Sequence, residues 1–81
     1  MNRDETLAHV AAVMASIAPE VDLSTIDPTA RLREEADIDS MDFLRLLAGL
    51  KARTGVEVAE ADYARVASLD GLLAHLQAHA G

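Results

Sequence analysis

The chain contains no cysteine and no tryptophan, and its aromatic residues are limited to Phe43 and Tyr63. Without thiols it has no disulfide framework and no thiolate metal site. Hydrophobic residues make up 51% of the sequence, so its core has to be built mainly from Leu, Val, Ile, Met and Ala. Because Leu and Ala are strong helix formers, this composition favours helices. A length of 81 residues then predicts a single small all-α domain over residues 1–81.

Basic residues are also scarce, and long apolar runs are absent. Seven Lys and Arg residues stand against fourteen Asp and Glu residues, which gives a net charge of −7. An acidic surface repels nucleic acids and anionic membranes, so neither is expected as a partner, and basic patches on other proteins are favoured. No run is long enough to span a bilayer, and no signal-peptide pattern is seen at the N-terminus. We therefore expect no stable membrane association; the compartment is left open, with cytoplasm as the default expectation, and the chain is expected to be a monomer.

The first half of the chain predicts one helix followed by a long loop. The helix should begin near Asn2 or Asp4, where Asn2 and Glu5 have the spacing of a capping box, and it should end before Pro19. Two prolines and no clear hydrophobic period follow, so residues 19–38 are interpreted as a long ordered loop.

The second half predicts a long helix from about Ser40 to Arg53, ended by Gly55. A short helix is expected around residues 62–66, and a last helix begins after Ser68 as its N-cap. The predicted fold is therefore a four-helix bundle with three principal helices and a short one between the second and the last. Its predicted core consists of Leu7, Val10, Met14, Ile17, Phe43, Leu47, Leu50, Leu69, Leu72, Leu73 and Leu76.

Ser40 lies at the start of the second predicted helix among aspartates, with no histidine or lysine beside it. A nucleophilic serine normally needs a neighbouring base, so Ser40 is not expected to be catalytic. Asp39 is the better N-cap, because Asp42 follows it at the spacing of a capping pair. This leaves the Ser40 hydroxyl exposed at the first helical position, where a phosphate would meet the helix dipole and unpaired N–H groups. Two interpretations stay open: an ordinary helix-start residue, or an acceptor for a phosphate-linked group.

The same helix carries two apolar stripes on well-separated faces. One is wide enough to face the core: Phe43, Leu46, Leu47 and Leu50. The other begins beside the serine and is either covered by the long loop or kept as a contact surface: Met41, Leu44 and Ala48. By helical angle, Arg45 and Lys51 flank this second stripe.

The stretch DSMDFLRLLAGLKARTGVEV, residues 39–58, resembles the region around the modified serine of acyl carrier proteins and the related peptidyl carrier domains. Their hallmark is Asp-Ser-Leu, an amphipathic helix, and a Gly-Ile/Val-x-Ile/Val segment. Here Asp39-Ser40-Met41 and Gly55-Val56-Glu57-Val58 stand at these places. The resemblance extends over nearly the whole chain, including the first helix, the long loop and the leucine-rich last helix.

The resemblance implies a fold of the acyl-carrier type and a role as a non-catalytic carrier. A phosphopantetheinyl transferase would attach 4′-phosphopantetheine to Ser40 through a phosphodiester, with Asp39 as motif residue and helix cap. The thiol of the arm would carry acyl groups as thioesters between a loading ligase or acyltransferase and downstream enzymes of fatty-acid, lipid or polyketide-type biosynthesis. Partners would dock on Met41, Asp42, Leu44, Arg45, Ala48 and Lys51. A carrier of aminoacyl or aryl groups and an unmodified interaction subunit are the alternatives.

Two departures from the family pattern suggest a specialised member. Many fatty-acid carriers have glutamates along this helix, whereas residues 39–53 carry a local charge of +1 here. In addition, Asp37-Ile38 stands where a Gly-Ala or similar pair often precedes the motif. His75 and His79 have the i, i+4 spacing of metal ligands, but no third ligand is suggested, so no metal site is expected.

Overall fold

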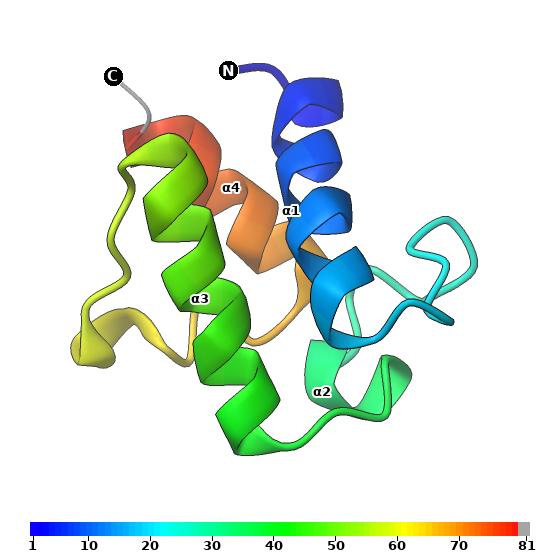
Figure 1. Ribbon diagram of the computed structural model, residues 1–81. Helices are drawn as coiled ribbons and strands as arrows, with labels where there is room; N and C mark the ends of the chain where they lie inside the picture. Colours follow the sequence, from blue (N-terminus) through cyan, green and yellow to red (C-terminus); the bar gives the residue numbers. More distant parts are fainter. Residues whose placement is uncertain (80–81) are drawn as a thin grey trace.

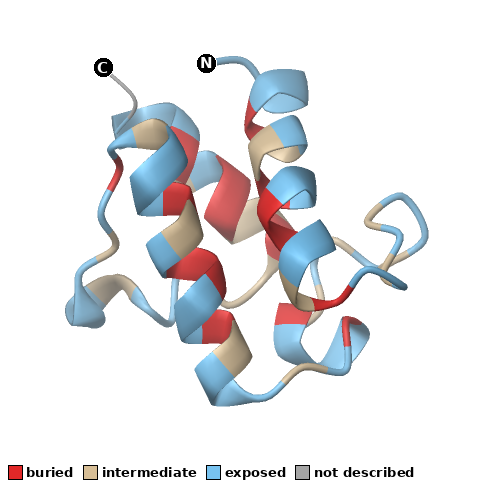
Figure 2. Ribbon diagram, in the orientation of Figure 1, coloured by how far each residue is buried: buried red, intermediate tan, exposed pale blue. Residues whose placement is uncertain are grey.

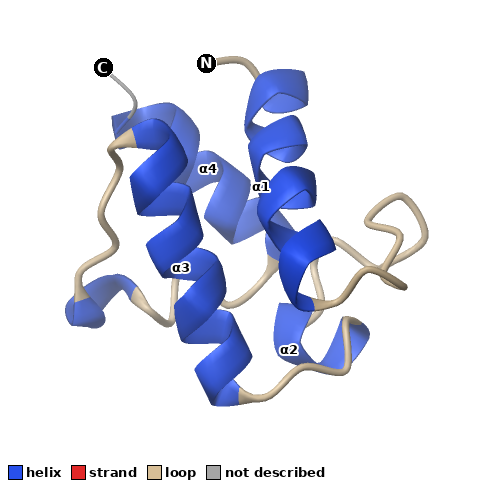
Figure 3. Cartoon of the chain, viewed as in Figure 1, coloured by secondary structure: helices blue, strands red, loops and turns tan. Residues whose placement is uncertain are grey.

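The computed structural model describes residues 1–79 and contains four α-helices and a 3₁₀ turn in that range. In chain order these are α1 (Arg3–Ile17), α2 (Leu32–Glu35), α3 (Ser40–Thr54), the 3₁₀ turn η1 (Glu60–Asp62) and α4 (Leu69–His79). Figure 3 shows the helices connected by loops, with no β-strand in the described part of the chain. One isolated antiparallel bridge joins Arg31 and Ser68. The all-α bundle predicted from the sequence is confirmed.

The three long helices form the body of the molecule. Helix α1 packs against both α3 and α4, and Figure 1 shows α4 passing behind the other two. The short helix α2 lies near the N-terminal end of α3, next to the connection that leads into it (Figure 1). None of the helices described is long and apolar enough to cross a membrane.

Local sequence signals set the helix ends. Asn2 caps α1 in a complete capping box, in which its side chain accepts from the N–H of Glu5 and the Glu5 carboxylate accepts from the N–H of Asn2. Gly55 ends α3 in the left-handed conformation, with φ of 76°, which glycine adopts without strain. The Ser68 hydroxyl accepts a hydrogen bond of 3.0 Å from the N–H of Gly71, as an N-cap of α4 does.

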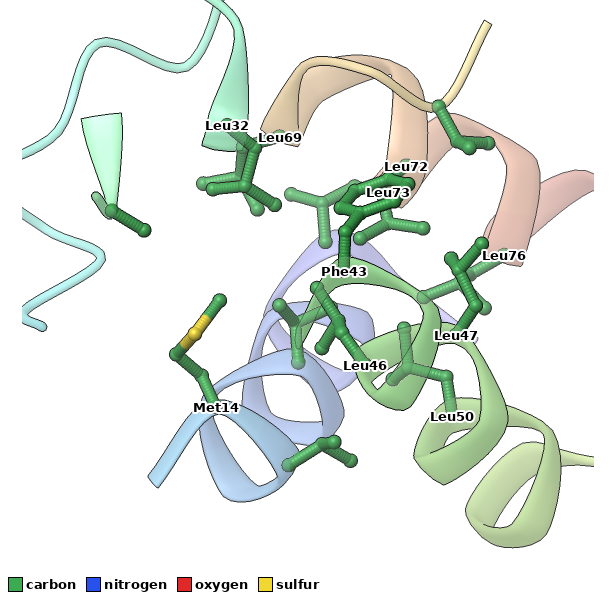
Figure 4. Packing of buried hydrophobic residues seen from close by; sticks show 14 of the residues in the cluster. Met14, Leu32, Phe43, Leu46, Leu47, Leu50, Leu69, Leu72, Leu73 and Leu76 are labelled. Atoms are coloured by element: carbon green, nitrogen blue, oxygen red, sulfur yellow. The ribbon is translucent and has the colours of Figure 1, made fainter. Parts of the chain in front are cut away.

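The core lies between α1, α3 and α4, and Figure 4 shows their side chains directed toward a common centre. Nine of the eleven residues predicted for it are buried. Leu7 and Ile17 are only partly buried and pack against its edge. The buried face of α1 includes Thr6 and Val13, which were not predicted. Ala and Val recur around this helix, so its sequence marks no single apolar stripe from which the buried face could be identified. Further buried hydrophobic residues outside the predicted set are Val13, Ala18, Leu32, Ala36, Leu46, Val56 and Val66.

Two short elements differ from the prediction. Residues 19–38 contain the one-turn helix α2, which is stabilised by tertiary contacts rather than by length: the Leu32 side chain is fully buried, and its N–H donates to the Ala67 carbonyl at 2.7 Å. The helix expected around residues 62–66 is instead η1 followed by turns. Both elements are too short for a hydrophobic period to mark them.

The rest of the long loop is ordered by two aspartate turns. The Asp22 carboxylate accepts from the hydroxyl and N–H of Ser24, and Asp27 does the same with Thr29. These hydrogen bonds lower the pKa of both aspartates below the ordinary value; the Ser24 hydroxyl has the largest effect on Asp22, and the Thr29 N–H on Asp27. The Asp27 N–H also donates to Glu35 at 2.7 Å, which ties the loop to α2.

Candidate functional site

Helix α3 begins at Ser40, as predicted, and Asp39 is its N-cap. The Asp39 carboxylate accepts a hydrogen bond of 2.8 Å from the N–H of Asp42. The first bond of the helix backbone runs from the N–H of Phe43 to the Asp39 carbonyl. Since Asp39 performs the capping, the exposed hydroxyl of Ser40 is not needed for it.

The chain has four serines, at positions 16, 24, 40 and 68, and Ser40 differs from the other three. Ser16 donates to the Val13 carbonyl at 2.7 Å, Ser24 donates to Asp22 at 2.6 Å, and Ser68 caps α4. The Ser40 hydroxyl makes no hydrogen bond to any other residue in the range 1–79. It is the one serine of the chain whose hydroxyl has no structural role in this range.

A tight turn leads from α2 into Ser40. Asp37 has φ of 53°, in the left-handed region, which only glycine and, less readily, Asn or Asp visit. This is the position at which the resembling family often has glycine, a residue that adopts positive φ without strain. The N–H of Ile38 donates to the Arg33 carbonyl at 3.0 Å, which closes the turn.

The outward face of α3 begins beside Ser40. Met41 and Leu44 are 59% and 42% exposed, respectively, and Ala48 is also exposed. Figure 2 shows exposed and buried segments alternating along α3. The stripe predicted as a contact surface is therefore not covered by the long loop and stays open to solvent.

The charged residues on this face are paired with neighbouring carboxylates. Arg45 donates to Asp42 at 2.9 Å, and Lys51 lies 3.3 Å from Glu57. Both cations are more than half exposed, with 67% and 57% of the side-chain surface accessible. Pairs of this kind contribute about 0–1 kcal/mol, so either cation can exchange its partner at little cost.

A pocket of about 430 Å³ opens beside Ser40. Ser40 and Leu44 of α3 line it, together with Tyr63 and two arginines, Arg31 and Arg33. No sequence pattern marks the last three residues as members of the site. They come from segments far apart in the chain, which the Arg31–Ser68 bridge and the backbone bond from Leu32 to Ala67 bring together.

The paired histidines of α4 form no metal centre in the described part of the chain. The His75 and His79 rings lie 4.2 Å apart between centroids, and His75 Nε2 is 3.3 Å from the Glu57 carbonyl. Among residues 1–79, no group of three or more His, Cys, Asp or Glu side chains is arranged to hold a metal ion.

Comparison with known protein families identifies the domain. The family described as the phosphopantetheine attachment site matches residues 8–76. The match covers most of the chain, so the protein belongs to this family of carrier domains. Its domain is the attachment site for 4′-phosphopantetheine, and the protein has a phosphopantetheine-bearing carrier role. A search of curated proteins gave no significant match.

Proposed function

We propose that Ser40 is the residue that bears 4′-phosphopantetheine and that the chain is a single carrier domain for acyl groups bound as thioesters. The observation that carries this proposal is the unpartnered, exposed Ser40 hydroxyl at the first position of α3. The match to the phosphopantetheine attachment family spans residues 8–76, which supports a search for the attachment residue in this range. The three other serines lie in the same range, but their hydroxyls already bond to the backbone of α1, to Asp22 in a turn, or to the first turn of α4 as a cap.

The surroundings of Ser40 suit a phosphodiester. The N–H groups of Ser40 and Met41 precede the first backbone bond of α3, which starts at Phe43, so they point out of the helix end. An anion bound there is stabilised by these donors and by the helix dipole. The neighbouring carboxylates of Asp37 and Asp39 repel an anion at this place. The N-terminal turn of α3 therefore offers N–H donors to the phosphodiester, and the two carboxylates offset part of their effect.

The chain presents a hydroxyl and does not activate it. The carboxylates closest to Ser40 along the chain, Asp39 and Asp42, already accept hydrogen bonds from the Asp42 N–H and from Arg45, and neither accepts one from the Ser40 hydroxyl in the range 1–79. A phosphopantetheinyl transferase must therefore take the proton from the Ser40 hydroxyl. The Ser40 oxygen then forms a new bond to phosphorus of coenzyme A, and the bond from that phosphorus to the departing adenosine bisphosphate breaks. Because the chain has no cysteine, the thiol that carries the acyl group comes from the attached arm.

The exposed face of α3 is proposed as the surface on which partners dock. It combines apolar side chains with adjustable charges: Met41, Asp42, Leu44, Arg45, Ala48 and Lys51. Large apolar groups that are exposed next to a modification site are typical of an interaction surface. The partners are the transferase, an acyl-loading ligase or acyltransferase, and enzymes of fatty-acid, lipid or polyketide-type biosynthesis. The basic residues favour a specialised member with dedicated partners.

The test is the intact mass of the protein after incubation with coenzyme A and a broad-specificity phosphopantetheinyl transferase. The wild-type chain should gain the mass of one phosphopantetheine. Ser40→Ala should gain nothing, while Ser24→Ala, which removes another exposed serine hydroxyl, should be modified like the wild type. If a control carrier is modified under the same conditions and this chain is not, Ser40 is not an attachment site and the protein acts as an unmodified interaction subunit.

A further inference from the structure

The pocket beside Ser40 combines two cations with an apolar wall. Its apolar part includes Leu44, Tyr63 and Ala64, whereas Arg31 and Arg33 contribute the basic groups. The chain as a whole has a net charge of −7, so a pocket lined by two arginines differs in charge from most of the surface. The pocket therefore offers an anionic ligand with an apolar extension a complementary surface.

Arg33 differs from most of the other cations because no carboxylate is paired with it in the described residues. Arg31 lies 3.6 Å from Glu34, and the other paired cations are Arg3, Arg45, Lys51 and Arg65. Within residues 1–79, Arg33 and Arg53 have no carboxylate at ion-pair distance, and Arg53 instead donates to His9 Nδ1 at 3.2 Å. Arg33 is thus the cation at the pocket that is available to an external anion.

The backbone fixes Arg33 close to the start of α3. Leu32, the residue before it, is fully buried, and the Leu32 N–H is bonded to the Ala67 carbonyl. The carbonyl of Arg33 accepts a hydrogen bond from the N–H of Ile38, which lies two residues before Ser40. The Arg33 side chain therefore emerges from an ordered segment on the pocket that contains Ser40.

We propose that Arg33, assisted by Arg31, binds the phosphodiester of the arm attached to Ser40 and holds the arm against the pocket wall formed by Leu44, Tyr63 and Ala64. This inference rests on the proposed modification of Ser40. A guanidinium presents paired donors that match phosphate oxygens, so arginine suits this contact better than lysine. The contact orders the arm in the carrier when no partner is bound. It also competes with the outward position of the arm that a partner enzyme needs.

Tyr63 provides the measurement. It is the only tyrosine, and the chain has no tryptophan, so the ultraviolet fluorescence of the protein comes from this one pocket residue. Acrylamide, a neutral quencher, should reach Tyr63 less readily after the arm is attached. The quenching constants of the unmodified and modified forms are compared for the wild type, Arg33→Gln, Arg33→Lys and the control Arg53→Gln.

In the wild type, modification should lower the quenching constant, and added salt should return it toward the value of the unmodified form. Losing Arg33 should lower the equilibrium constant for docking of the arm by a factor of about 1.4 to 5, the range for an exposed ion pair. Arg33→Lys should retain part of the effect, and Arg53→Gln should behave like the wild type. In phosphorus NMR, the resonance of the phosphodiester should shift between the wild type and Arg33→Gln.

Intact mass separates this inference from the proposed function. If no phosphopantetheine is gained, the assignment of Ser40 fails before Tyr63 is measured. If the mass rises but the quenching of Tyr63 stays the same, the arm does not occupy the pocket and the inference is overturned. The same holds if modified Arg33→Gln protects Tyr63 as well as the modified wild type does, or if salt has no effect on the modified wild type.

Discussion

Helix α3 carries leucines on two faces, and only one face belongs to the core. Leu46 on the inner face is fully buried, whereas Leu44 on the outer face is 42% exposed. The inner face packs against α1 and joins the core that the leucines of α4 also enter, while the outer face borders the pocket next to Ser40. The fold therefore depends on the inner leucines. The outer apolar side chains contribute little to the fold, and their place beside Ser40 favours a role in binding partners.

The largest expected difference between the two faces is in stability. Leu46→Ala should lower the free energy of unfolding by about 2–5 kcal/mol, because it removes a buried side chain and leaves a cavity. Leu44→Ala should change it by about 0.5 kcal/mol or less, because it acts at an exposed position. Urea unfolding followed by circular dichroism measures both values. Equal losses for the two variants would show that Leu44 belongs to the core and that the outer face is not a free surface.

A second prediction concerns Gly49, where α3 approaches α1. A methyl group added to Gly49 would lie 2.5 Å from Val13 Cγ1. The valine side chain cannot easily move away, because its rotation about the Cα–Cβ bond is restricted. Gly49→Ala should therefore destabilise the protein by about 1–2 kcal/mol, because overpacking outweighs a gain of about 1 kcal/mol in helix propensity. At the exposed neighbour on the outer face, Ala48→Gly should cost about 1 kcal/mol through propensity alone.

A double-mutant cycle with Val13→Ala tests this reason for the effect of Gly49→Ala. When the valine methyl groups are absent, Gly49→Ala should become stabilising. A Gly49→Ala change that destabilises equally in both backgrounds would place the cause in the helix itself and not in its contact with α1.

The helix ends were predictable because their signals are local. Asn2, Asp39, Gly55 and Ser68 each act on residues three or four positions away, and all four have the predicted role. The inner stripe of α3 was predictable for the same reason, since a helical period is written in neighbouring residues. The start of α3 at Ser40 and the free hydroxyl follow from these local signals.

Features that depend on contacts between distant segments were not predictable in the same way. The helix α2 is stabilised by the burial of Leu32 and by its backbone bond to Ala67, 35 positions along the chain. The pocket joins Arg33 to Tyr63 through the same contact. For Asp37, a signal did exist: glycine is common at this position in the resembling family, which is consistent with a positive φ.

The turn at Asp37 gives a third prediction, because it sets where α3 begins and hence where its two faces point. Asp37→Val should lower the free energy of unfolding by about 1–2 kcal/mol, since a β-branched residue is strained at φ of 53°. Asp37→Gly should be neutral or slightly stabilising, since glycine adopts this conformation without strain. Thermal unfolding compares the two variants. A valine variant as stable as the wild type would mean that the turn can change its conformation without cost.

The smallest expected effect on stability, and the most selective effect on function, concerns the charges of the outer face. Arg45→Glu with Lys51→Glu removes two exposed ion pairs, with Asp42 and Glu57, that contribute about 0–1 kcal/mol each. The basic patches of enzymes that serve acidic carriers would repel Arg45 and Lys51, so the double change should speed reaction with a general fatty-acid enzyme and slow loading by the dedicated one. The two rates are measured on modified protein, with Arg53→Glu as a charge control outside the face. If neither rate changes, Arg45 and Lys51 serve only their local pairs, and partner choice depends on the apolar side chains or on the turn before Ser40.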